Sequence, residues 1–106
     1  MGLFDLFRSA DINSKLLEAR EVKDAVILDV RNADEFREGH IPGAINVPVD
    51  RIEDIGKKVK KKDTPIYSYC LMGTRSSKAV AALKAMGYTN VTNIGGIRRY
   101  KGPIER

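Results

Sequence analysis

The stretch PIYSYCLMGTRSSKAVAALKAMG, residues 65–87, contains the signals of a strand, a short turn and a helix in direct succession. Pro65 suits the first position of a strand over residues 66–69, because that position tolerates a missing N–H. The helix is expected over residues 76–86, and Gly87 stands where a left-handed C-terminal cap is typical. Four apolar residues repeat there at helical spacing: Ala79, Ala82, Leu83 and Met86.

Similar units precede and follow this stretch. Residues 25–30, AVILDV, form a continuous apolar run with β-branched members, which is typical of a strand covered on both faces of a parallel sheet. Shorter strands are expected over residues 44–47 and 91–94, and helices over residues 12–20, 33–38 and 51–59. Strands that alternate with helices indicate parallel βα units in an α/β fold.

The composition is that of an ordinary folded domain. The 106 residues are 42% hydrophobic and 31% charged, and no repeat or flexible linker divides them. We therefore expect one domain over residues 1–106.

Nothing in the sequence predicts a membrane or a secretory route. No apolar stretch approaches the roughly 18 residues that span a bilayer. In residues 1–10, Asp5 interrupts the apolar residues and no basic region precedes them, so no signal peptide is expected. Gly2 does not begin a myristoylation motif, because Leu6 stands where that motif has Ser or Thr. A lone cysteine also favours the cytoplasm, where thiols stay reduced.

An excess of basic over acidic residues raises the question of nucleic-acid binding. The net charge is +5, and residues 57–62 read KKVKKK. However, no aromatic residues interleave with these lysines, and no nucleic-acid-binding motif is present. We interpret the stretch as a solvated segment and expect neither a nucleic-acid nor a membrane partner.

Cys70 is the only cysteine, and it follows the strand and precedes the helix of the opening stretch. Ligands of parallel sheets bind beyond the carboxyl ends of the strands, and a helix N-terminus offers free N–H groups to an anion. Residues 70–75, CLMGTR, are able to curl their amides around such an anion, with Gly73 at the tight turn. That environment lowers the pKa of a thiol and predicts a reactive Cys70, whereas the alternative is a buried structural cysteine.

Three segments together resemble the rhodanese domain family: DVRNADEFREGHIPGAINVP over residues 29–48, CLMGTRS from Cys70, and GGIRRY from Gly95. The resemblance covers residues 26–102 and implies a single rhodanese domain. It further implies a central parallel sheet of four to five strands with helices on both faces. The catalytic cysteine of such a domain opens a loop that runs into a helix.

The resemblance also implies a reaction. Family members with a six-residue loop, as in residues 70–75, are typically sulfurtransferases, whereas related phosphatases and arsenate reductases have a loop one residue longer. Cys70 would take a sulfane sulfur from thiosulfate or a similar donor, hold it as a persulfide, and pass it to a thiol or cyanide. A protein donor or acceptor is an alternative. So are a sulfur carrier, a docking module and, less favoured, a cysteine phosphatase or arsenate reductase. No cofactor or metal is implied.

The resemblance assigns the site residues as follows. Cys70 is the catalytic nucleophile, and the loop amides stabilise the anionic sulfur. Arg75 matches the arginine that closes the loop and is expected to steer thiosulfate. The substrate-binding residues are Leu71, Met72, Gly73, Thr74, Arg75 and Ser76, with Ser77 as a further donor.

Four more residues in the first motif are interpreted as framework. Arg31 and Glu35 are four apart and are expected to pair across a helix turn. Asp29, at a strand end, is expected to be a hydrogen-bonded structural carboxylate. His40 is the only histidine, but the resemblance gives it a framework role rather than that of a base for Cys70.

The sequence departs from the family near its end and within the loop. Tyr100 stands where tryptophan is usual, and Arg98 and Arg99 stand where small or apolar residues are common. The arginines either add positive potential near the site or are simply solvated. Leu71 and Met72 leave the loop uncharged around its glycine, which is compatible with an apolar or protein-bound acceptor.

Overall fold

The computed structural model describes residues 11–106, so the expectations for residues 1–10 lie outside the described part of the chain. Four strands form one sheet in the order β2-β1-β3-β4, and every neighbouring pair is parallel. The strands are β1 (Val26–Asp29), β2 (Ile45–Asn46), β3 (Ile66–Cys70) and β4 (Val91–Gly96). This confirms the predicted α/β fold with a central parallel sheet.

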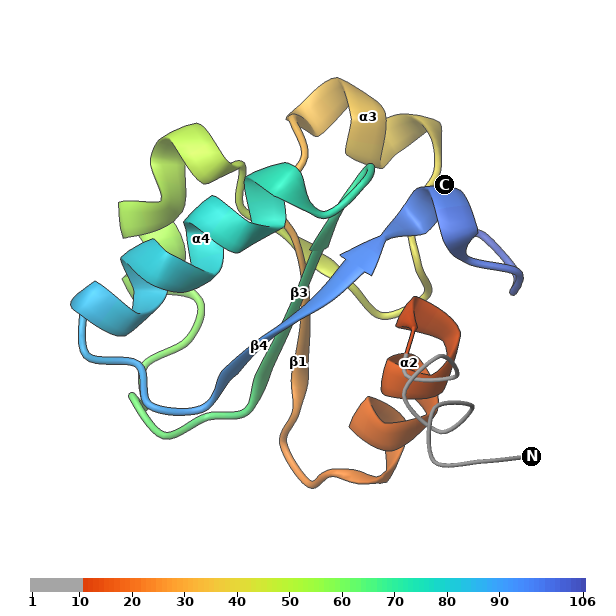
Figure 1. Ribbon diagram of the computed structural model, residues 1–106. Coiled ribbons are helices and arrows are strands. Elements are labelled where there is room, and N and C mark those ends of the chain that lie inside the picture. Colours follow the sequence, from red (N-terminus) through yellow and green to blue (C-terminus); the bar gives the residue numbers. More distant parts are fainter. Residues whose placement is uncertain (1–10) are drawn as a thin grey trace.

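Helices cover both faces of the sheet (Figure 1). The helix α2 (Ile12–Glu21) lies on one face, while α4 (Thr74–Ala85) and the 3-10 helix η1 (Val49–Lys57) lie on the other. Two short elements complete the fold, namely α3 (Ala33–Glu38) and the 3-10 helix η2 (Ile97–Arg99).

The sheet separates two apolar clusters. On the α4 side, Leu28 of β1 and Ile66 of β3 pack with Leu83 and Ile55, and all four are essentially without solvent exposure. On the α2 side, Ile27 of β1 packs with residues that include Ile12 and Leu16. Successive residues of β1 thus face opposite clusters, which is why its sequence is apolar throughout.

Two predicted elements differ from the structure. The helix expected over residues 51–59 is the 3-10 helix Val49–Lys57, and Arg51 leaves helical geometry inside it with φ −127° and ψ 30°. Ile52 and Ile55 bury their side chains, so the expected helical segment is present, with 3-10 geometry. The strand expected over residues 44–47 is reduced to Ile45–Asn46, because only these two residues pair with β1.

The helix α4 ends as predicted and begins two residues earlier than predicted. Gly87 adopts a φ of +98°, and the N–H groups of Tyr88 and Gly87 donate to the carbonyls of Leu83 and Lys84, both at 3.0 Å. This pattern is a Schellman motif, which a left-handed glycine makes possible. At the other end, Thr74 is already helical and Gly73 is the N-cap residue.

The lysine-rich stretch is exposed but anchored. Val59 at its centre is buried in the α4-side cluster. Lys62 donates to the carbonyl of Met86 at 3.0 Å, and its ammonium lies 4.2 Å from the centroid of the Tyr88 ring. The segment thus fastens η1 to the end of α4. Over the described residues, no helix is long and apolar enough to cross a membrane.

Candidate active site

Cys70 is the last residue of β3, at the carboxyl end of the strand and directly before the turn into α4. It is buried, with only 1% of its surface exposed, and it belongs to the α4-side apolar cluster together with Val30 and Ala79. Burial of this degree is equally typical of an inert structural thiol. The polar neighbours of the sulfur must therefore decide between the two interpretations.

Two backbone N–H groups point at the sulfur. The amide of Gly73 lies 2.9 Å from Cys70 Sγ, and the amide of Ser76 lies 3.3 Å from it. Gly73 reaches this position with a φ of +104°, a backbone conformation that L side chains rarely adopt. Donors aimed at a sulfur next to a helix N-terminus stabilise negative charge on it. An inert core thiol needs no such donors.

The other expected loop residues contribute differently. Ser76 is buried, and its hydroxyl donates to Ser68 Oγ at 2.8 Å, which fixes the first turn of α4 on β3. Leu71 and Met72 expose 40% and 63% of their surface. Thr74 is exposed in the first turn of α4. Within residues 11–106, none of the amides at positions 71, 72, 74 and 75 hydrogen-bonds to the sulfur.

The strand β4 holds the other side of the loop, a feature that sequence reasoning did not identify. A Cβ on Gly96 would lie 2.2 Å from the carbonyl oxygen of Leu71 and 2.6 Å from the Cα of Met72. Asn93 donates from Nδ2 to the carbonyl of Gly73 at 3.2 Å. The paired glycines in GGIRRY were the available signal, because such a close approach of two backbones requires a residue without a side chain.

Arg75 forms an ion pair with a carboxylate. Its guanidinium donates to Glu35 Oε1 at 2.7 Å and to Oε2 at 3.0 Å, a two-pronged ion pair. The hydrogen bonds raise the pKa of Arg75 and, for the same reason, lower the pKa of Glu35. The predicted Arg31–Glu35 pair is therefore wrong. Arg31 precedes the N-cap residue Asn32, so it is not on the helix that would have aligned the two side chains.

Arg31 instead neutralises a buried acid. Asp29 at the end of β1 is fully buried, and Arg31 donates to its two oxygens at distances from 2.7 to 3.1 Å. Burial alone would lower the pKa of Arg31, but the hydrogen bonds to Asp29 and its charge outweigh that effect and raise it. The hydroxyl of Tyr69 also donates to Asp29, at 2.7 Å, and burial followed by this neighbouring charge raises its pKa. We call Asp29, Arg31 and Tyr69 the Asp29 network.

His40 contacts framework groups. Its ring stacks on Phe36 with centroids 3.7 Å apart, and Nδ1 lies 2.8 Å from the carbonyl oxygen of Phe36. Nε2 lies 3.8 Å from a carboxylate oxygen of Glu105, whose backbone also pairs with that of His40. Within residues 11–106, none of the polar partners of His40 is Cys70.

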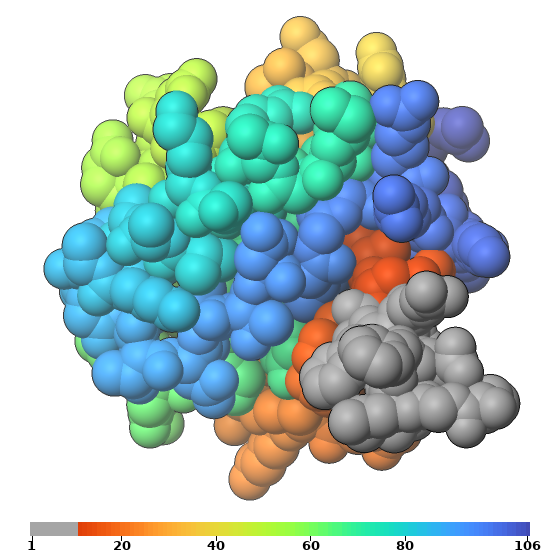
Figure 2. Space-filling model, viewed as in Figure 1, coloured from red at the N-terminus to blue at the C-terminus, as the bar shows by residue number. Residues whose placement is uncertain are grey.

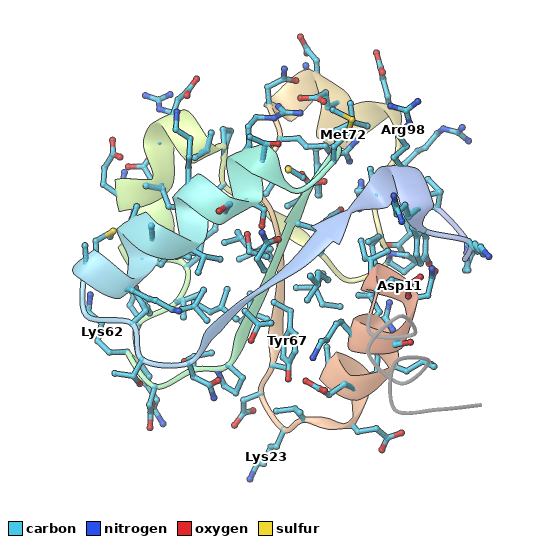
Figure 3. The ribbon with its side chains drawn as sticks, in the orientation of Figure 1. Asp11, Lys23, Lys62, Tyr67, Met72 and Arg98 are labelled. Atoms are coloured by element: carbon cyan, nitrogen blue, oxygen red, sulfur yellow. The ribbon has the colours of Figure 1, made fainter. Side chains whose placement is uncertain are left out.

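A cleft of about 570 Å³ lies beside the loop, and we call it the arginine cleft. It is lined by Leu71, Met72, Gly96, Arg98 and Arg99. Figure 3 shows Met72 and Arg98 next to each other, and an Arg98 nitrogen lies 3.3 Å from Met72 Sδ. In the space-filling view the teal atoms after β3 adjoin the blue C-terminal segment (Figure 2). No group of three potential metal ligands occurs in the described part of the chain.

A family model described as the rhodanese-like domain matches residues 9–102, which is most of the chain. The chain belongs to the rhodanese-like domain family. This rhodanese-like domain is 36% identical to the thiosulfate sulfurtransferase PspE of Escherichia coli over 72 residues, covering 67% of the chain and 69% of that relative. The resemblance stated from the three sequence segments is thereby confirmed.

Other relatives are longer than the chain. A tRNA uridine(34) hydroxylase of Buchnera aphidicola is 41% identical over 98 residues, covering 85% of the chain but only 30% of the relative. A putative sulfur carrier protein, YrkF of Bacillus subtilis, is 35% identical over 80 residues, covering 74% of the chain and 43% of the relative. The chain thus spans less than half the length of these two relatives.

Solved structures show the same fold. A rhodanese with anions from E. coli superposes with a TM-score of 0.72 at 34% identity, covering 77% of the chain and 98% of that structure. A rhodanese-like domain protein from Staphylococcus aureus gives a TM-score of 0.76 at 33% identity, covering 88% of the chain and 92% of the structure. The sheet and the helices on both of its faces therefore follow the family fold.

Proposed function

We propose that this rhodanese-like domain is a sulfurtransferase that carries a sulfane sulfur on Cys70 as a persulfide. The observation that supports the proposal best is the pair of amides, from Gly73 and Ser76, that point at a buried sulfur between β3 and α4. Such donors stabilise the sulfur when it carries negative charge, as an oxyanion hole does for oxygen. The charge is present on the attacking thiolate and again on the leaving thiolate.

Two half-reactions follow from this chemistry. In the first, the Cys70 thiolate attacks the outer sulfur of thiosulfate, a new S–S bond forms, the S–S bond of thiosulfate breaks, and sulfite leaves with its electron pair. In the second, an acceptor thiolate or cyanide attacks the outer sulfur of the persulfide and releases the Cys70 thiolate. A covalent enzyme form of this kind predicts ping-pong kinetics.

The site residues divide the work. Cys70 is the nucleophile, and the amides of Gly73 and Ser76 stabilise its charge. Arg75, bound to Glu35, positions the first turn of α4 and adds positive charge to the region of the sulfur. Leu71, Met72 and Thr74 are exposed around the turn and offer the surface that a substrate meets.

A sulfur-carrier role is the second candidate, since YrkF, named a putative sulfur carrier, is among the relatives. It would use the same cysteine, with a protein donor or acceptor, and would differ by slow turnover with small donors. Phosphatase or arsenate reductase activity is less favoured, because residues 70–75 make the shorter, six-residue loop. Either sulfur role requires a reduced thiol, which is why we place the protein in the cytoplasm.

The test is the mass of the intact protein before and after thiosulfate, and again after a reductant. We expect a reversible gain of one sulfur atom in the wild type and none in Cys70→Ser. Steady-state transfer to cyanide then separates the two sulfur roles, because a carrier would gain the sulfur from thiosulfate without turning over at an enzymatic rate. A wild-type protein that never gains sulfur from thiosulfate or a protein persulfide would overturn the proposal.

A further inference from the structure

We propose that the arginine cleft binds the carboxylate groups of a peptide-sized acceptor thiol, which removes the sulfane sulfur from Cys70. The inference rests on the proposed function, because the Cys70 persulfide is the other reactant. Three independent features of the cleft support it: its unpaired charge, its size and lining, and its position beside the cysteine. Arg98 and Arg99 stand where small or apolar residues are common in the family.

The charge of the cleft comes from Arg98 and Arg99. Both side chains are exposed, and neither forms an ion pair with any residue in 11–106. The polar contact of the Arg98 guanidinium is the uncharged sulfur of Met72. Asp11 and Arg99 line a neighbouring hollow, but the Asp11 carboxylate accepts the N–H groups of Asn13 and Ser14 at the start of α2. Arg98 and Arg99 both line the cleft, and carboxylates are the natural partners of their guanidinium groups.

The size and lining argue for a ligand larger than thiosulfate. The volume of about 570 Å³ falls within the roughly 300 to 1,000 Å³ of small-molecule sites. Leu71 and Met72 supply an apolar wall, with 40% and 63% of their surface exposed. A thiol with a short peptide backbone and free carboxylates would contact both the apolar wall and the arginines. Thiosulfate would fill only a small part of a cleft of this volume.

The cleft lies beside the loop that begins at Cys70. Leu71 directly follows Cys70, and Gly96 is the residue paired with Cys70 across β3 and β4. The N–H of Arg98 donates to the carbonyl of Leu71 at 3.1 Å, so the arginine segment is fastened to the loop. The bound thiolate attacks the outer persulfide sulfur, its S–S bond forms as the bond to Sγ breaks, and Cys70 leaves as a thiolate. The proton on the outer sulfur stays with the product persulfide, so no oxidant or reductant is required.

The experiment measures discharge of protein preloaded with thiosulfate and freed of excess donor. The probes are glutathione, the small anionic thiol 3-mercaptopropionate and the neutral thiol 2-mercaptoethanol. In the Arg98→Gln/Arg99→Gln variant we expect the second-order rate with glutathione to fall about tenfold at low salt, and the rate with 2-mercaptoethanol to change by less than about twofold. Because each thiol is compared with itself, differences in thiol reactivity cancel. Arg98→Lys/Arg99→Lys should keep most of the glutathione rate.

A matched control removes a positive charge elsewhere. Lys60 is exposed and precedes β3, whereas Cys70 ends that strand, so Lys60→Gln should leave all three discharge rates unchanged. An equal loss with neutral and anionic thiols would overturn the inference. So would an equal loss in the loading step with thiosulfate, because the arginines would then attract anions in general.

A binding measurement separates this inference from the proposed function. S-methylglutathione cannot accept sulfur, and its titration into the wild type should shift the amide NMR signals of Leu71, Met72 and Arg98, but not in the double glutamine variant. Shifts without any sulfur loading of Cys70 would support ligand binding in the cleft and contradict the proposed sulfurtransferase activity. Sulfur loading without these shifts, together with an unchanged rate of discharge by glutathione in the variant, would contradict only the inference about the arginine cleft.

Discussion

The carboxyl ends of β1 and β3 lie side by side and bury two chemically different side chains. Asp29 has no exposed surface and Cys70 has 1%, and Asp29 pairs with Tyr69, the residue before the cysteine. Asp29 is surrounded by the guanidinium of Arg31 and the hydroxyl of Tyr69, whereas Cys70 has apolar neighbours and two amide donors. Equally buried strand ends thus hold a carboxylate fixed by an ion pair in β1 and a sulfur that accepts two backbone N–H groups in β3.

The largest expected effect comes from replacing the Cys70 thiol, and it is on activity rather than on stability. Cys70→Ser should reduce thiosulfate-dependent transfer to background, because the hydroxyl is a poor nucleophile without a base. Stability should change by no more than about 1 kcal/mol, since the serine oxygen is able to accept the same two amides. Transfer assays measure the loss of activity, and thermal unfolding measures the change in stability. Turnover comparable to wild type would contradict a role for the thiol.

The second effect comes from removing the charge of the buried Asp29 carboxylate, and it is on stability. Asp29→Asn leaves the buried Arg31 without a counter-charge, so we expect a loss of about 3 to 5 kcal/mol in the free energy of unfolding. Asp63→Asn is the control, because Asp63 is exposed in a turn. Chemical denaturation of both variants gives the comparison. If Asp29→Asn unfolds no more easily than Asp63→Asn, the Asp29 network is not a structural anchor.

The third effect is on the placement of the sulfur donors. Gly96 has φ −124° and ψ 139°, a backbone that alanine adopts freely, so Gly96→Ala tests contact alone. Its new Cβ would lie 2.2 Å from the Leu71 oxygen and would push the loop outward. A displacement of about 1 Å at reacting groups costs on the order of a hundredfold, and we expect that loss in transfer per folded molecule.

A control for this substitution is present in the chain. A Cβ on Gly56 would meet no atom within 4 Å, so Gly56→Ala should leave transfer unchanged. Circular dichroism and unfolding curves establish the folded fraction of each variant. Full transfer in folded Gly96→Ala would mean that the loop tolerates displacement and that amide placement does not limit the reaction.

The sequence predicts the elements well where their apolar pattern is local. The run in residues 25–30 and the spacing in residues 76–86 each report on one strand or helix, and both elements are present in the structure. Gly87 and Gly73 were also predictable, because a tight turn or a left-handed cap is a property of a few consecutive residues. The 3-10 geometry of η1 was missed, since apolar spacing does not distinguish it from an α-helix over so short a segment.

The partners of charged side chains were much harder to predict. Arg31 and Glu35 have the spacing of a helical pair, yet Arg31 turns to Asp29 and Glu35 binds Arg75, which is forty residues away. The choice depends on which charges the fold buries together, and the burial of Asp29 outweighs a weak helical pair. For the same reason the approach of Gly96 to Leu71 follows from the register of β3 and β4 rather than from either sequence segment.

The smallest expected effect is on the ion pair between Arg75 and Glu35, which links α4 to α3, the helices that follow β3 and β1. The hydrogen bonds from Arg75 hold the pKa of Glu35 below its ordinary value of about 4.3. A carboxyl whose pKa is lower in the folded state stabilises the fold above its unfolded pKa, and this contribution is lost as the pH falls through the folded pKa.

Glu35→Gln keeps an oxygen that can accept the N–H of Asn32, so it removes the charge while preserving the helix cap. The side chains of Glu35 and Arg75 are partly exposed, at 25% and 35%. We therefore expect the free energy of unfolding of Glu35→Gln to fall by less than about 1 kcal/mol at pH 7. The difference from wild type should shrink between about pH 5 and pH 3, whereas Glu38→Gln on the same helix should show little difference at either pH. Unfolding curves at pH 7 and pH 3.5 measure it, and a difference that stays constant or grows in acid would show that the charge of Glu35 does not act through Arg75.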